Sequence, residues 1–104
     1  MKLGEEIYYN ELFAEYSVLL SPAQKEIFEM YSGMDLSFGE IAEIKGISRQ
    51  SASDAVTKAK KQLVSLEEKL GLLSKKKAVY RLIEGLSGEN EKIKLEIEKI
   101  LGDN

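Results

Sequence analysis

Apolar residues recur every three or four positions along most of this chain, and no stretch alternates between apolar and polar residues. A spacing of three and four is that of one face of an α-helix, whereas a half-buried strand repeats every two residues. The chain has 104 residues, which is enough for one modest hydrophobic core. The sequence therefore predicts an all-α fold.

Serine residues mark the expected helix starts. Ser21 stands before Pro22 and three residues before Gln24, and Ser37 stands three residues before Glu40. Both spacings are those of a capping box, in which the serine and the third helical residue bond each other's backbone N–H groups. We therefore expect a second helix after Ser21 and a third, short helix after Ser37.

The first two expected helices each place apolar residues on one side. The first helix is expected over residues 5–20, and the second ends near Ser32 and Gly33. The positions expected to be buried on them are Tyr9, Leu12, Phe13, Tyr16, Leu19, Leu20, Ile27, Phe28 and Tyr31.

The segment over residues 36–63 has the spacing of a helix-turn-helix motif. Ala42 is small enough for a close helix crossing, and four residues later Gly46 can adopt the left-handed conformation that ends a helix. Ile47 is expected to plug the turn, and Ser48 to cap the next helix. The residues expected to face back onto Ile41 and Ala42 are Ala52, Ala55 and Val56. These features favour the motif over a plain helical hairpin with a glycine cap.

Polar and basic residues remain on the outward side of the second helix of this motif. Recognition helices of this kind bring their N-terminal residues to base edges and phosphates in the major groove of DNA. The candidate nucleic-acid-binding residues are Lys45, Ser48, Arg49, Gln50, Ser53, Thr57, Lys58, Lys60 and Lys61. Asp54 is also on this helix, where we expect it to pair with Lys58 four residues later.

Charge is distributed unevenly along the chain. The net charge is −3, but residues 1–44 carry −7, residues 45–81 carry +7 and residues 82–104 carry −3. Phosphate responds to the charges within a Debye length, which is about 8 Å at physiological salt. An acidic protein can therefore present a basic face, although the lysines can equally be solvated helix surface.

The chain contains no cysteine and no histidine. Disulfides, thiolate zinc sites and the usual nucleophiles and general bases are therefore absent, and we expect no enzymatic activity, no cofactor and no metal. The N-terminal residues are acidic and lack a long apolar run, so we expect neither a signal peptide nor a membrane span. The expected location is the cytoplasm, without membrane association.

Apolar residues continue beyond the motif at alternating steps of four and three, which is a heptad pattern. The positions are Ala52, Val56, Ala59, Leu63, Leu66, Leu70 and Leu73. The first half of this seam is expected to pack on the first helix. The half from Leu63 extends past a three-helix core, so we expect it to pack on the C-terminal helices or on a second subunit. Folding back is favoured, and a homodimer is also expected.

The last part of the chain is expected to form further helices. We divide the chain into a helix-turn-helix domain with N-terminal supporting helices over residues 1–73 and a helical extension over residues 74–104, which packs on that domain or on a second subunit. Gly85 and residues 87–90 mark an expected bend. The two apolar stripes are Val79, Leu82, Ile83 and Leu86, and Ile93, Ile97, Ile100 and Leu101.

The segment "LSFGEIAEIKGISRQSASDAV" followed by "KKQL" resembles region 4 of bacterial sigma factors. With "LLSPAQKEIFEMYSGMDLS" in front of it, the chain resembles more closely the YlxM family of small helix-turn-helix proteins, from Leu12 to Leu73. The resemblance implies an all-helical fold, a gene beside those of the signal recognition particle GTPases, and a candidate regulatory role in that pathway. It also implies that Arg49, Gln50 and Ser53 occupy outward positions of the recognition helix.

Two hypotheses about function follow. The first is a DNA-binding regulatory protein of the signal recognition particle pathway, with DNA favoured over RNA as the nucleic acid. The alternative is a non-enzymatic interaction module that binds the signal recognition particle RNA or its GTPase directly, since a lysine-rich, arginine-poor surface also fits an RNA backbone.

Overall fold

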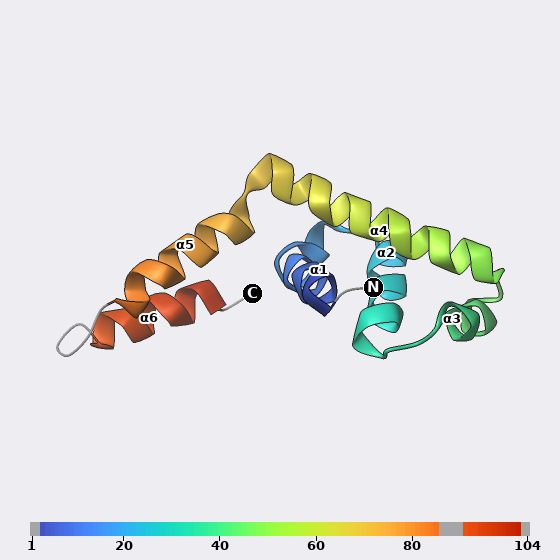
Figure 1. The fold of residues 1–104 in the computed structure, drawn as a ribbon, viewed down its shortest axis with the longest axis horizontal. Coiled ribbons are helices and arrows are strands. Elements are labelled where there is room, and N and C mark those ends of the chain that lie inside the picture. The colour runs from blue at the N-terminus through green and yellow to red at the C-terminus, as the bar shows by residue number, and fades with distance from the viewer. Residues whose placement is uncertain (1–2, 86–90, 103–104) are drawn as a thin grey trace.

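The computed structural model describes residues 3–85 and 91–102, and every regular element in these ranges is a helix (Figure 1). The elements are α1 (Leu3–Tyr16), η1 (Ser17–Leu19), α2 (Pro22–Phe28), η2 (Glu29–Gly33), α3 (Phe38–Lys45), α4 (Arg49–Leu70), α5 (Leu72–Glu84) and α6 (Glu91–Gly102). The all-α helix-turn-helix fold predicted from the sequence is confirmed.

The first helix is shorter than its apolar pattern predicts. It ends at Tyr16, and a single 3₁₀ turn, η1, leads to Leu20 in an extended conformation. The tighter turn directs Leu19 outward, where 52% of the residue is exposed, whereas Leu20 is buried. The expectation that Leu19 belongs to the buried face is therefore wrong.

The second helix begins at the predicted capping box. The Gln24 N–H donates to Ser21 Oγ at 3.2 Å, and the Ser21 N–H donates to Gln24 Oε1 at 3.3 Å. After α2 the backbone widens into the π-helical turn η2, in which Met34 N–H donates to the Glu29 carbonyl. Met30, in this turn and three residues after the buried Ile27, also belongs to the core.

The core has two parts, which follow one another along the long helix α4. The part nearest the start of α4 contains Ile27, Met30, Ile41, Ala42, Ala52 and Val56. The second part contains Leu12, Tyr16, Leu20, Phe28, Ala59, Leu63 and Leu73. The expectation that the first half of the heptad seam packs on the first helix is wrong for Ala52 and Val56, which pack on α2, η2 and α3. Ala59 and Leu63 do lie in the cluster that contains residues of α1, together with Leu73 of α5.

The chain bends sharply after α4. Gly71 adopts a left-handed conformation with φ of 62°, which ends α4 and allows α5 to leave in a new direction (Figure 1). Leu70 is 42% exposed at this bend, so the predicted seam does not continue through it.

A carboxylate from α4 caps the start of α5. Gly71 has no side chain to cap the helix, and Glu67 instead accepts hydrogen bonds from the N–H groups of Leu73 and Ser74 at 3.0 and 3.1 Å. The Tyr16 hydroxyl donates to Glu67 Oε1 at 2.5 Å and accepts from the Leu72 N–H at 3.0 Å. These bonds fix the direction of α5 relative to α1 and α4, because they join all three helices.

Helices α5 and α6 form an arm that projects away from the other helices (Figure 1). The radius of gyration is 16.9 Å, whereas a compact domain of this length has about 13 Å. Helix α6 packs chiefly against α5. The expected bend over residues 87–90 and the expected apolar position Leu86 lie outside the described residues.

Candidate nucleic-acid interface

The turn between α3 and α4 has the local features that a helix-turn-helix requires. Gly46 is left-handed with φ of 68°, and the Ile47 N–H donates to the Ala42 carbonyl at 3.0 Å. Ser48 caps α4, because its Oγ accepts from the Ser51 N–H at 2.9 Å. Ile47 remains 39% exposed, so it does not plug the turn as the sequence predicts.

The N-terminal half of α4 presents a polar, solvent-exposed side. Ala52 is fully buried and Val56 is 2% exposed, so the opposite side of the helix faces solvent. The exposed or half-exposed candidate residues on α4 are Arg49, Gln50, Ser53, Thr57, Lys58 and Lys61. The first turn of α4 contains no acidic residue, so the positive end of its helix dipole is not neutralised there. An anion can therefore approach this end of the helix.

A shallow depression lies along this outward side. It is lined by Ser51, Asp54, Ala55, Thr57, Lys58 and Lys61. The structure thus brings Thr57, Lys58 and Lys61 together, on the side of the helix that does not contact the core.

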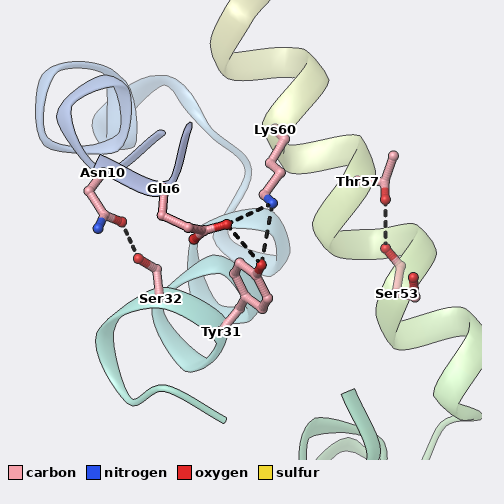
Figure 2. A network of polar contacts seen from close by, with 7 residues as sticks. All are labelled: Glu6, Asn10, Tyr31, Ser32, Ser53, Thr57 and Lys60. Atoms are coloured by element: carbon pink, nitrogen blue, oxygen red, sulfur yellow. Dashed lines mark hydrogen bonds and ion pairs between the residues drawn. The ribbon is translucent and has the colours of Figure 1, made fainter. Parts of the chain in front are cut away.

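Two hydrogen bonds hold polar side chains along α4. Gln50 Nε2 donates to Asp54 Oδ1 at 2.9 Å, in place of the expected pair between Asp54 and Lys58. Thr57 Oγ1 donates to the Ser53 carbonyl at 3.0 Å (Figure 2). Because Gln50 is engaged with Asp54, its amide would have to leave this bond to contact a base edge.

Lys60 points away from the outward side and toward α1 and η2 (Figure 2). Its Nζ lies 3.5 Å from Glu6 Oε1 and 3.4 Å from the Tyr31 hydroxyl, and its side chain is only 14% exposed. The same nitrogen lies 4.9 Å from the ring centre of Tyr9 and 4.8 Å from that of Tyr31. Two cation–π contacts and one ion pair therefore engage Lys60 within the protein.

The environment of Lys60 also changes the acidity of Tyr31. Its hydroxyl donates to Glu6 Oε1 at 3.1 Å. Burial and the nearby Glu6 carboxylate raise the pKa of Tyr31 to about 12. Tyr31 therefore remains a neutral hydrogen-bond donor at physiological pH. No local sequence pattern predicts this cluster, because its members come from segments 25 to 54 residues apart.

Other lysines of the basic block are also paired with glutamates. Lys76 Nζ lies 3.3 Å from Glu15 Oε2, and Lys77 Nζ lies 3.1 Å from Glu11 Oε2. The acidic helix α1 thus lies against the basic residues of α5, much as Glu6 lies against Lys60 of α4. Opposite charges separated in the sequence meet in the fold.

Lys45, at the end of α3, forms a further ion pair with Glu26 of α2 at 3.0 Å. Among the described residues no ion pair involves Arg49, Lys58 or Lys61. Lys69, in the last turn of α4, is also outside these pairs. Of the candidate residues on α4, Arg49, Lys58 and Lys61 can therefore neutralise phosphate without first breaking an internal pair.

Neither a metal site nor a membrane span occurs in the part of the chain that the structure describes. No three acidic side chains there gather as ligands of one cation would. No helix over residues 3–85 or 91–102 has both the length and the apolar character needed to cross a bilayer.

Comparison with known proteins identifies the family. Residues 3–102 match the model of UPF0122, described as "Putative helix-turn-helix protein, YlxM / p13 like". A UPF0122 protein of Caldanaerobacter subterraneus is 45% identical over 78 residues, which cover 75% of this chain and 67% of that relative. No solved structure is significantly similar to the chain.

Two further relatives have similar coverage. A UPF0122 protein of Mycoplasma capricolum is 41% identical over 81 residues, which cover 78% of this chain and 72% of the relative. One of Oceanobacillus iheyensis is 43% identical over 77 residues, which cover 74% of this chain and 73% of the relative. The family match includes both helices of the motif and the left-handed turn between them. The chain belongs to the UPF0122 family of YlxM/p13-like helix-turn-helix proteins.

Proposed function

We propose that the protein is a non-enzymatic, cytoplasmic regulatory protein that binds DNA through exposed residues of α4. One observation carries the proposal: Arg49 at the first position of α4, and Lys58 and Lys61 near its middle, are exposed and outside every ion pair among the described residues. Phosphate contacts by such cations supply most of the affinity of proteins for nucleic acid. The helix-turn-helix geometry then directs this side of α4 toward a groove.

The remaining candidates have supporting roles in this proposal. Ser48 caps α4, and Lys45 and Lys60 join helices through their ion pairs. The proposed contact surface therefore consists of Arg49, Gln50, Ser53, Thr57, Lys58 and Lys61.

DNA is the favoured nucleic acid because of the shape of the binding element. A single helix fits the wide major groove of B-form DNA, whereas the major groove of A-form RNA is too narrow for it. We further propose that the protein acts as a homodimer, since helix-turn-helix proteins commonly place one recognition helix in each of two half-sites. The signal recognition particle pathway is proposed as its context from the family resemblance.

Arg49 is expected to be the main base-reading residue. Replacing Arg49 with alanine should weaken sequence-selective DNA binding by about 1 to 3 kcal/mol, because arginine is the side chain that best bonds guanine in the major groove. Gln50→Ala should have a smaller effect, since Asp54 already engages its amide. Fluorescence anisotropy on DNA selected from a random library measures both changes.

The matched control is Arg81→Ala, which removes the same charge from an exposed position on α5. Equal affinities of the Arg49→Ala and Arg81→Ala variants for the selected DNA would remove the base-reading role.

A second candidate function is an interaction module that binds the signal recognition particle RNA or its GTPase directly. It is favoured by exposed apolar residues close to the motif, since Met34 is 65% and Ile44 is 59% exposed. Recovery of the protein from cell extract with and without nuclease separates the two candidates. Loss of the co-purifying material after DNase treatment supports the first, and a GTPase complex that survives nuclease supports the second.

A further inference from the structure

The arm formed by α5 and α6 leaves much of its apolar surface uncovered. On α6, Ile97 and Leu101 are half-buried, but Ile93 is 53% and Ile100 is 73% exposed. On α5, Leu82 is 75% exposed although the next residue, Ile83, is buried. Two helices that pack together bury only the sides that face each other. The other apolar residues of α5 and α6 therefore lack a covering layer.

The uncovered residues lie on one side of the arm. A single depression is bordered by Leu72 and Val79 of α5 and by Ile100 of α6. Leu82 lies one helical turn after Val79, and Ile93 lies two turns before Ile100, so both extend the same side toward the other end of the arm. We call this side the arm face and define it by Leu72, Val79, Leu82, Ile93 and Ile100.

The α1–α4 body reaches the arm face at its Leu72 end, where Glu15 of α1 lines the same depression, and the rest of the face extends away from the body. Helix α6 packs chiefly against α5, and the molecule extends over 57 Å along its longest axis but only 26 and 25 Å along the others. The arm therefore stands away from the α1–α4 body (Figure 1).

We propose that the arm face binds the arm face of a second copy of this chain, which makes α5 and α6 chiefly a dimerisation unit. This inference rests on the homodimer of the proposed function and assigns it an interface. Two hairpins that pack face to face form a four-helix bundle, in which such faces are buried. In an interface with two-fold symmetry the same apolar surface serves both copies.

Charge at the edges of the arm face selects one arrangement of the two copies. Lys75 borders the depression on the α5 side. Glu96 is exposed on α6, three residues after Ile93 and four before Ile100, so it borders the same face on the α6 side. Packing α5 of one copy against α6 of the other brings Lys75 toward Glu96 at both lateral edges of the interface. The two recognition helices then lie at the same end of the bundle, where both can reach one DNA molecule.

Sedimentation equilibrium without nucleic acid tests this interface. At tens of micromolar the parent should have twice the 11.7 kDa mass of the chain. The double variant Leu82→Glu/Ile100→Glu should have the mass of one chain, because charge cannot be buried in the apolar interface without a partner. Its far-UV circular dichroism should match that of the parent, since both side chains are already more than 70% exposed in the single chain.

The matched control introduces the same charges elsewhere. Val18 is 81% exposed in η1, and Leu95 is 57% exposed on α6 outside the arm face. The variant Val18→Glu/Leu95→Glu should remain a dimer. A monomeric parent, a dimeric Leu82→Glu/Ile100→Glu variant, or equal dissociation of the two double variants would overturn the proposal.

Charge reversal tests the arrangement of the helices. Lys75→Glu and Glu96→Lys should each weaken self-association, and a mixture of the two variants should associate several-fold more tightly than either alone. Equal association in the mixture and in the single variants would overturn the packing of α5 against α6. None of these measurements involves DNA, so a failure of DNA binding would leave their outcome unchanged.

Discussion

Replacing Glu67 with alanine is expected to lower the free energy of unfolding by about 2 to 3 kcal/mol, because it removes the carboxylate that caps α5. Two backbone N–H groups, those of Leu73 and Ser74, would lose their acceptor, and so would the Tyr16 hydroxyl. Tyr16 is fully buried, so its hydroxyl has no access to water as a replacement. Urea unfolding followed by far-UV circular dichroism measures the change.

Glu68→Ala is the matched control for this prediction. Glu68 is the next residue on α4 and is exposed, so its loss should change stability by less than about 0.5 kcal/mol. Tyr16→Phe removes only the hydroxyl and should cost about 1 to 2 kcal/mol, since the Leu72 N–H then lacks its acceptor. A Glu67→Ala variant as stable as Glu68→Ala would show that the cap does not hold α5.

The cap at Glu67 also predicts a dependence of stability on pH. Partial burial favours the protonated carboxyl, but the hydrogen bonds from Tyr16, Ser74 and Leu73 outweigh it and hold the pKa of Glu67 below its ordinary value of 4.5. A lowered pKa stabilises the fold above the ordinary value, and this stabilisation is lost as the pH falls through the pKa of the folded state. The stability advantage of the parent over Glu67→Gln should therefore be constant near neutral pH and shrink in acid. An advantage that does not change with pH would contradict this role of the carboxylate.

The local features of the helix-turn-helix were predictable from short stretches of sequence. The capping box at Ser37, the left-handed Gly46 and the cap at Ser48 each depend on residues no more than four positions apart. Such signals can be recognised in sequence because they act within one turn of the chain. The buried positions Ala52 and Val56 follow from the helical period in the same way.

Contacts between distant segments were not predictable in the same way. Lys60 has the same residue type as Lys58 and Lys61, and only the fold brings Glu6, Tyr9 and Tyr31 around it. The division of the chain into acidic and basic segments was visible in the sequence. The sequence did not show that residues of these segments pair with each other in the fold. Three lysines of the basic block pair with glutamates of the first helix, and Lys45 pairs with Glu26 of α2, so the number of lysines overstates the charge that remains for phosphate.

The packing of the heptad seam illustrates a second limit. Periodicity showed which side of α4 is apolar, but it does not show which helix covers that side. In the fold, the 3₁₀ turn η1 and the bend at Gly71 bring Leu20 and Leu73 to the same cluster as Leu63. The 3₁₀ turn and the bend each change the direction of the chain without changing the spacing of its apolar residues.

The central claim is that the exposed, unpaired cations of α4 bind nucleic acid and that the paired lysines do not. Lys58→Ala/Lys61→Ala is expected to weaken binding to duplex DNA by about 100-fold for each bound chain near 0.1 M salt, because each phosphate contact releases about one counterion. The matched control, Lys76→Ala/Lys77→Ala, removes the same charge from lysines that are engaged by Glu15 and Glu11.

The most direct measurement is the dependence of the DNA dissociation constant on salt for the parent and both double variants. For each bound chain, the logarithm of the binding constant should fall with the logarithm of salt at a slope of about −3 for the parent and for Lys76→Ala/Lys77→Ala, and about −1 for Lys58→Ala/Lys61→Ala. A homodimer on two half-sites should show about twice these slopes. Equal slopes and affinities for the two double variants, or a parent that does not bind DNA even at low salt, would contradict the account.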